Sequence, residues 1–252
     1  MKPVHILFRI ITALAISLAG CGLPRPQTDP SLDKAAWQAA RAIRSMNQEI
    51  QTSKGTGKVR LESPGGVQIY QIAWAARAPD RVRITFTASG HPVETIAADG
   101  SRVTFLSHTG RHKPHTPAAS DPDLEPYTRV PVRLSDLICL LLGQVPVQHF
   151  DDAWFLPEDQ SRILLRKNFR SHSQELILEP NNTIRMLRLL DREEVVRWEI
   201  LYHAFDTMDK RKIPVHMTIT NGEHQKAHIT ITRFWPNVPV KESVFQLTQT
   251  GS

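Results

Sequence analysis

The stretch Arg81-Val82-Arg83-Ile84-Thr85-Phe86-Thr87-Ala88 decides the fold of this chain. Its apolar side chains alternate with polar ones, and this period of two is typical of a β-strand that buries one face. Val82, Ile84 and Phe86 would therefore point into a core, whereas the arginines and threonines would point away from it. Ser89-Gly90-His91-Pro92 follows as a turn, so the pattern predicts a strand that ends at a tight connection.

Similar strands are predicted on both sides of this stretch. Tyr70, Ile72 and Trp74 share one face of the run at residues 67–75, and Asp99-Gly100 is a strong hairpin signal. Further strands are expected at residues 58–62, 93–97, 103–106, 153–156, 163–167, 175–179, 184–190, 195–203, 215–220 and 227–234. No helix separates neighbouring strands within each group, which excludes a parallel α/β sheet. About a dozen strands, interrupted once, predict a mainly β (α+β) fold with a single large, curved antiparallel sheet.

Two helices are predicted to pack against this sheet. The first begins near Ser31, a plausible N-cap, and its apolar stripe would be Leu32, Ala36, Ala40, Ile43, Met46 and Ile50. The second covers residues 134–142. Its inward stripe would be Leu134, Leu137, Ile138, Leu141 and Leu142. Gly143 suits the position after its C-terminus, and Pro146 prevents its continuation. A helix this apolar either belongs to the core or covers an apolar cavity, and both interpretations stay open.

The N-terminus has the layout of a secretory signal. Basic residues precede an apolar run that is too short to span a bilayer as a mature helix. The run ends at Leu18-Ala19-Gly20-Cys21, which resembles the bacterial lipobox, in which the cysteine is acylated and the leader is removed before it. We expect residues 1–20 to be a lipoprotein signal peptide and residues 21–30, which contain three prolines, to form a lipidated flexible tether. The alternative is an ordinary cleaved signal with an incidental cysteine.

The composition is that of a folded chain that can approach a membrane surface. The 252 residues are 40% hydrophobic, which is enough for a real core, and residues 31–252 would form one domain. The formal net charge is +6, or about +4 without the leader. This charge suits anionic lipid headgroups as well as a merely soluble basic surface. The predicted secretion as a lipoprotein argues against nucleic acid as a partner. With Cys21 acylated, Cys139 is the remaining cysteine, so we expect no internal disulfide. We also expect the protein to be a monomer.

Motifs that would carry chemistry are weak in this sequence. There is no Gly-x-Ser-x-Gly elbow and no His-Glu-x-x-His motif. His108, His112 and His115 cluster in a proline-rich loop expected at residues 107–130. Because no cysteine or acidic residue lies beside them at a recognised zinc spacing, a solvated loop is the better interpretation. We expect no catalytic residue, no metal site and no cofactor.

Three segments of the chain resemble one known family. They are the run at residues 80–87 with its Gly90 turn and Asp99-Gly100 hairpin, the segment Pro131-Val132-Arg133-Leu134-Ser135-Asp136-Leu137-Ile138-Cys139-Leu140-Leu141-Leu142-Gly143-Gln144-Val145-Pro146, and Ile213-Pro214 with the strands after it. The first is similar to the opening half of the family's sheet, the second to a helix that ends in a Trp-Ile-Leu-Gly-x-Pro-like sequence, and the third to its last strands. Together with the lipobox, these segments resemble the LolA/LolB family of lipoprotein carriers, and the LolB-like members most.

The resemblance implies a fold and a function. The fold would be an incomplete antiparallel barrel whose open side is covered by the N-terminal helix and by a short apolar lid helix. The cavity would bind acyl chains, and its candidate lining residues are Tyr70, Ile72, Trp74, Val82, Ile84, Phe86, Leu134, Leu137, Ile138 and Leu141. The protein would be a non-enzymatic lipoprotein at the periplasmic face of the outer membrane of a Gram-negative bacterium. It would accept lipoproteins, or another lipid such as phospholipid, from a periplasmic LolA-like carrier and insert them.

One departure from the family pattern matters for delivery to the membrane. LolB-like members carry an exposed leucine in the turn after the Arg-x-Arg strand, whereas this turn reads Ala88-Ser89-Gly90-His91. Gly22, rather than aspartate, follows Cys21, which by the family's sorting rule favours the outer membrane. Two alternatives stay open. One is a structural or assembly lipoprotein whose core is filled by its own side chains and which binds protein partners. The other is an enzyme acting on envelope lipid or glycan.

Overall fold

The computed structural model describes residues 30–117, 120–128, 132–168 and 170–247. The strands in these ranges are β1 (Thr52–Ser63), β2 (Gly66–Arg77), β3 (Arg81–Ala88), β4 (His91–Asp99), β5 (Val103–Ser107), β6 (Asp152–Leu156), β7 (Asp159–Arg166), β8 (Ser173–Leu178), β9 (Ile184–Leu190), β10 (Val196–Met208), β11 (Arg211–Asn221) and β12 (Lys226–Pro236). The helices are α2 (Pro30–Arg44), α3 (Glu125–Thr128), α4 (Leu134–Leu141) and the 3-10 helix η1 (Glu242–Phe245). No helix in the described ranges is long and apolar enough to cross a membrane.

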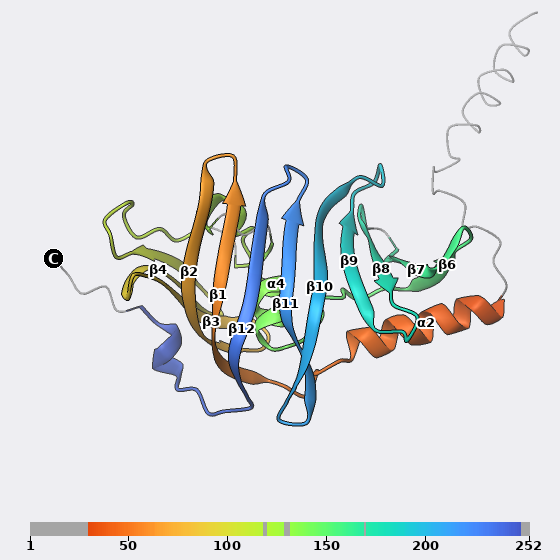
Figure 1. Ribbon diagram of the computed structural model, residues 1–252, viewed down its shortest axis with the longest axis horizontal. Coiled ribbons are helices and arrows are strands. Elements are labelled where there is room, and N and C mark those ends of the chain that lie inside the picture. The colour runs from red at the N-terminus through yellow and green to blue at the C-terminus, as the bar shows by residue number, and fades with distance from the viewer. Residues whose placement is uncertain (1–29, 118–119, 129–131, 169, 248–252) are drawn as a thin grey trace, which may run out of the picture.

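All twelve strands form one antiparallel sheet, in the order β5-β4-β3-β2-β1-β12-β11-β10-β9-β8-β7-β6 (Figure 1). The first and last strands, β1 and β12, are therefore neighbours in its middle. The edge strands β5 and β6 are not paired with each other, so the sheet does not close into a barrel. The predicted single antiparallel sheet in the form of an incomplete barrel is confirmed.

Alternating burial explains why residues 81–88 form β3. Val82, Ile84 and Phe86 are at most 6% exposed, while the residues between them are only half-buried. At the end of β3, Ser89 and Gly90 have φ angles of 49° and 82°. Two successive positive φ angles belong to the type I′ turn, which matches the twist of a two-residue hairpin. The predicted turn between β3 and β4 is therefore confirmed.

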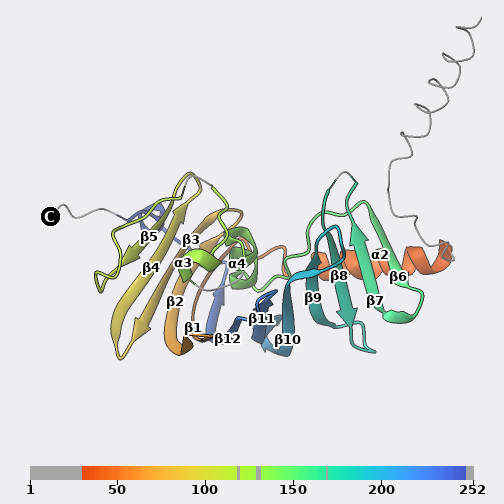
Figure 2. The same ribbon diagram turned by 90° about the horizontal axis from the view of Figure 1, so that it is seen from above.

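The connection between β5 and β6 crosses the inner face of the sheet, because these consecutive strands lie at opposite edges. It carries α3 and α4, and Figure 2 shows both helices between the two halves of the sheet. The helix predicted at residues 134–142 is confirmed as α4. Gly143 ends it with a φ of 72°, and a Cβ atom there would lie 2.8 Å from Cδ1 of Ile213. The expected loop at residues 107–130 is only partly a loop, because His115 pairs with Phe105 and α3 forms a helical turn.

Several strands, among them β1, β10 and β11, are longer than the sequence pattern predicts. β10 runs to Met208 and β11 begins at Arg211, although Pro214 interrupts the strand pattern there. The structure accommodates the proline because the pairing register shifts on both sides of Ala204, close to where Phe205 faces Pro214. Such bulges are among the few places where a strand tolerates proline.

The N-terminal helix α2 differs from its prediction at both ends. It begins at Pro30, so Ser31 lies inside the first turn and is not the N-cap. Proline suits the first turn because its missing N–H would have no helical partner. The buried residues Ala36, Ala40 and Ile43 join the same hydrophobic cluster as Ala153 and Ile163 of β6 and β7. The helix ends at Arg44, and Met46 and Ile50 lie beyond it although both face the core.

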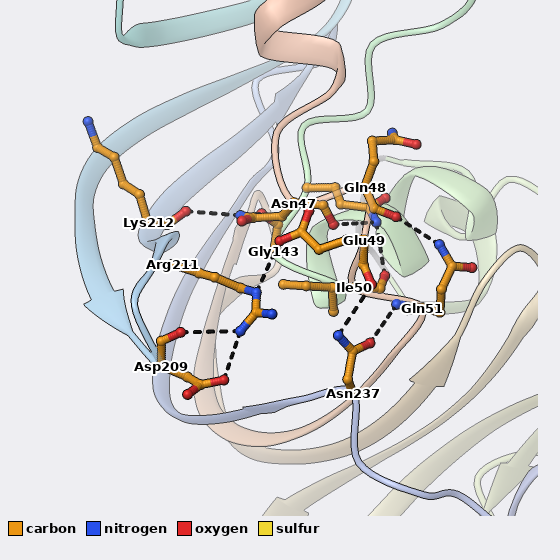
Figure 3. A network of polar contacts seen from close by, with 11 residues as sticks. Asn47, Gln48, Glu49, Ile50, Gln51, Gly143, Asp209, Arg211, Lys212 and Asn237 are labelled. Atoms are coloured by element: carbon orange, nitrogen blue, oxygen red, sulfur yellow. Dashed lines mark hydrogen bonds and ion pairs between the residues drawn. The ribbon is translucent and has the colours of Figure 1, made fainter.

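Asn47 explains why the helix stops there and ties three elements together. Its φ of 59° is left-handed, which an α-helix does not tolerate. Its side-chain nitrogen donates hydrogen bonds to the carbonyl oxygens of Gly143, at 2.6 Å, and Lys212, at 2.9 Å (Figure 3). In return, the Gln144 amide donates to the carbonyl oxygens of Asn47 and Ile50, both at 3.1 Å. The junction between α2 and β1 is thus fixed to the end of α4 and to the β10–β11 hairpin.

We predict that Asn47→Ala lowers the free energy of unfolding by roughly 2–4 kcal/mol, because two buried carbonyl groups lose their donor and alanine disfavours the left-handed backbone. Urea unfolding followed by circular dichroism measures this change. Asn182→Ala is the matched control, since Asn182 has the same φ of 59° but lies exposed in the β8–β9 turn. Its loss should be limited to about 1 kcal/mol of backbone strain. Equal losses in the two variants would contradict the role given to the Asn47 side chain.

Candidate functional site

The ten residues predicted to line a cavity lie on the inner face of the sheet and on α4. Nine of them are buried, and Tyr70 is half-buried at the margin of the same hydrophobic cluster. The structure therefore brings all ten together. Most of them, however, pack in the core.

Helix α4 is held directly against the floor of the half-barrel. The Ser53 hydroxyl of β1 donates a hydrogen bond of 2.6 Å to the Leu141 carbonyl oxygen, and it accepts one of 3.1 Å from the Trp74 indole N–H. Leu137 and Leu141 are 5% and 2% exposed. In the middle of the sheet, α4 is thus a packed core element.

Open space remains at the ends of β1 to β4 that carry the β1–β2 and β3–β4 hairpins, and we call this end of the strands the hairpin edge. The β1–β2 hairpin lies at the top of Figure 1. A half-open pocket of about 290 Å³ lies at the hairpin edge. Its lining is Leu61, Gln68, Tyr70, Phe86, Val93, Glu94, Thr109, Arg111, His112 and Pro126. Tyr70 and Phe86 meet edge to face with ring centroids 6.0 Å apart. Of the ten predicted residues, these two line this pocket.

The segment after β5 covers the pocket and is fixed by polar contacts. Nε2 of His112 lies 3.0 Å and 3.2 Å from the two carboxylate oxygens of Glu94 on β4. The ring's other nitrogen bonds the Lys113 carbonyl oxygen, and this bond together with Glu94 raises the pKa of His112. The Arg111 N–H donates to the Ser107 hydroxyl at 3.2 Å. Among the described residues, no acidic side chain forms an ion pair with Arg111.

A second space of about 180 Å³ lies at the N-terminal end of α4. Its lining is Pro79, Asp80, Gly100, Ser120, Asp121, Leu134, Ser135 and Ile138. Leu134 and Ile138 are thus core residues that also border this smaller hollow.

Sequence reasoning missed most residues of the larger pocket. Leu61 falls on the inward side of β1, and that alternation could have identified it. Alternation in β4 turns Ile96 and Ala98 inward and Val93 outward, and Val93 reaches the pocket at the register shift between β3 and β4. Thr109, Arg111 and Pro126 carried no such signal, because they reach the pocket only through the path of the loop. The lipobox residues Leu18, Ala19, Gly20 and Cys21 lie outside the described residues. Within those ranges, no three metal-ligating side chains come together.

The buried polar groups near α4 do not have the properties of a nucleophilic centre. Burial raises the pKa of the Cys139 thiol to about 12, so it stays protonated at neutral pH, whereas the thiolate is the reactive form. Asp136, in the first turn of α4, is 7% exposed. Burial, followed by the nearby Asp121 carboxylate, raises the pKa of Asp136 to about 7. We therefore expect the stability of the protein around α4 to depend on pH through Asp136.

We predict that Asp136→Asn stabilises the protein at pH 8 and changes little at pH 4.5. In the unfolded chain Asp136 ionises near the ordinary pKa of 3.8, whereas in the fold it holds its proton up to about pH 7. Its contribution to stability is therefore lost as pH rises from about 4 to 7. The free energy of unfolding of the variant minus that of the wild type should increase by roughly 2–4 kcal/mol over this range, measured by urea unfolding at each pH.

Asp159→Asn is the matched control for this experiment. Hydrogen bonds from the Ser161 side chain and backbone lower the pKa of Asp159 at the start of β7. Its stabilisation is lost as pH falls, so its pH dependence should have the opposite sign. A difference in unfolding free energy between Asp136→Asn and the wild type that does not change with pH would contradict the burial of an ionisable group in α4.

Comparison with known proteins shows a similarity in fold but no significant similarity in sequence. No family model matches the sequence, and no curated protein matches it at a significant level. A DUF1329 family protein from Desulfovibrio piger is similar in structure with a TM-score of 0.60 and 12% identity, over 87% of this chain and 98% of that one. A LolA superfamily protein from Nitrosomonas europaea has a TM-score of 0.54 and 11% identity, over 84% and 97% of the two chains. The chain therefore has the LolA-like fold.

Proposed function

We propose that this chain is an envelope lipoprotein that binds an acyl chain in the pocket at the hairpin edge of its half-barrel. The observation that carries the proposal is the half-open pocket of about 290 Å³ with Leu61, Tyr70, Phe86 and Val93 among its lining residues. Ligand pockets in proteins begin at about 300 Å³, so this one suits a single acyl segment. The LolA-like fold and the resemblance of the sequence to lipoprotein carriers support the same function.

The anchoring part of the proposal rests on the lipobox. Cys21 would carry the lipid, residues 21–30 would be the tether, and residues 31–252 the LolB-like half-barrel domain at the periplasmic face of the outer membrane. Two or three acyl chains are enough for stable anchoring, whereas one is not. The protein would act as a monomer and without catalysis, exchanging lipoproteins or another lipid with a soluble LolA-like carrier or with the membrane.

The β3–β4 turn lacks the exposed leucine of LolB-like proteins, but the hairpin edge beside the pocket offers other apolar side chains for contact with a membrane. Val67 and Ile69 of β2 are 54% and 48% exposed, next to the β1–β2 turn. They lie on the outer face of the strand, while Tyr70 lies on the inner face with the pocket. An edge that presents apolar side chains beside the pocket would let a chain pass between the pocket and a bilayer.

The structural lipoprotein is the alternative that a specific observation favours. Helix α4 is packed as core, so the middle of the half-barrel is filled by the protein's own side chains. On that alternative the pocket at the edge would bind no lipid.

We predict that Val93→Trp weakens binding of a fluorescent single-chain acyl probe at least tenfold, because the indole would fill the pocket without changing its charge. Val67→Trp is the control, since it adds the same side chain to the outer face of β2. The dissociation constants are measured by probe fluorescence on full chains carrying Cys21→Ser, and circular dichroism verifies that each variant is folded. Native mass spectrometry of the same chain from a bacterial envelope identifies any lipid that co-purifies. No binding of any acyl probe and a clean mass would favour the structural lipoprotein.

We also predict that Cys21→Ser, in a chain whose residues 1–20 are replaced by an ordinary cleavable secretory leader, moves the protein from the membrane fraction to the soluble periplasmic fraction. The leader is exchanged because processing at a lipobox follows acylation of the cysteine, so the original leader would stay attached to the variant and hold it in the membrane. The Cys21 thiol is the group that the lipid would occupy, and the described chain has no helix able to span a bilayer. Fractionation of cells expressing each form measures the change. Cys139→Ser is the control, because Cys139 lies in α4 and should leave the distribution unchanged. A membrane-bound Cys21→Ser protein would contradict lipid anchoring at this residue.

A further inference from the structure

Three acidic or basic side chains line the larger pocket. They are Glu94 on β4, and Arg111 and His112 on the segment that covers the pocket. His112 contacts both oxygens of the Glu94 carboxylate, at 3.0 Å and 3.2 Å. The acidic group of the pocket is therefore already engaged. Arg111 is exposed and forms no ion pair with an acidic side chain of the described residues, so its guanidinium remains available to a ligand.

The rest of the lining has a different character. It is mostly apolar, with Leu61, Tyr70, Phe86, Val93 and Pro126. Gln68 and Thr109 add two uncharged polar side chains. A ligand that satisfies both parts must therefore be amphipathic, with an apolar part against the strands and an anion beside the covering segment. Guanidinium groups bind carboxylates and phosphates through paired, charge-assisted hydrogen bonds.

We propose that the pocket binds a single-chain amphiphile with an anionic head, and that Arg111 donates hydrogen bonds to that head while the chain lies against Leu61, Tyr70 and Phe86. This inference rests on the proposed function and narrows it. The acylated N-terminus of a lipoprotein carries ester and amide groups but no anion at its head. The arrangement therefore favours a fatty-acid carboxylate or a lysophospholipid phosphate over the lipoprotein itself.

The test compares three ligands of equal chain length on the full chain carrying Cys21→Ser. They are laurate, lauroyl lysophosphatidate and the neutral monolaurin, used below their micelle concentrations and measured by displacement of a fluorescent acyl probe. At least one of the two anionic ligands should bind at least tenfold more tightly than monolaurin. The anionic ligand that binds more tightly shows whether the pocket prefers a fatty-acid carboxylate or a lysophospholipid phosphate.

Arg111→Gln should weaken binding of that anionic ligand about tenfold and leave monolaurin unchanged, because a hydrogen bond to a charged group contributes about 1.5–3 kcal/mol. Lys113→Gln is the matched control, since Lys113 is an exposed cation two residues away that does not line the pocket. It should change neither affinity.

Each other outcome has a definite meaning. Equal binding of the neutral and anionic ligands, or an anionic affinity that ignores Arg111→Gln, would overturn the anionic head while the acyl pocket stands. The same loss in Lys113→Gln as in Arg111→Gln would show a general effect of charge and would also overturn it. No binding by any of the three ligands, together with no binding of the probe, would instead reject the acyl pocket and with it the proposed function.

Discussion

The pairing of β1 with β12 is the constraint on which the rest of this structure depends. It places the first and last strands in the middle of the sheet and leaves β5 and β6 as the two edges. These edge strands are consecutive in the sequence, so the chain between them has to cross the whole inner face. A segment that crosses an apolar face needs apolar side chains and hydrogen bonds for its backbone groups. The apolar helix α4 provides both. The lid helix thus follows from the topology of the sheet.

The crossing segment is fixed by a small polar junction inside an otherwise apolar interior. Asn47 and Gln144 exchange hydrogen bonds with backbone carbonyls of three elements that are distant in sequence. On the exposed side of the same junction, Asn237 bonds the backbone of Glu49 and Gln51, and Arg211 pairs with Glu49 (Figure 3). Buried amides cost little when every group is satisfied, and they then specify one arrangement. Asp136 is the contrast, because burial opposes its charge and raises its pKa to about 7.

Local patterns predicted the local structure of this chain. The alternation at Val82, Ile84 and Phe86 identified β3, and the stripe of leucines with Gly143 identified α4. The pairing of β1 with β12 has no local signal, because it joins strands from opposite ends of the chain. The early end of α2 depends on the left-handed backbone of Asn47. The apolar residues Met46 and Ile50 on either side of it keep the helical spacing, so the sequence pattern did not predict this end.

The pocket was predicted less well than the fold, for a physical reason. Periodicity tells which side chains face inward, but it does not tell how much space they leave between them. Leu137 and Trp74 were assigned correctly to the inner face, yet they pack as core because α4 sits on the floor of the half-barrel. The larger space is left toward the hairpin edge, where a covering loop takes the place of α4. That loop contributes Arg111 and His112, whose positions depend on a path that no periodic pattern encodes.

An open edge pocket has consequences for the exchange that we propose. Each buried CH₂ group contributes about 0.8 kcal/mol, both in the pocket and in a bilayer. A pocket of about 290 Å³ holds only part of a chain, so the bilayer always offers the apolar tail at least as much burial. A lipid would therefore leave the pocket for the membrane without an energy source, and the contacts at its head would determine which lipid enters. Selectivity in such a carrier lies at the covering loop, because the apolar walls accept every acyl chain equally.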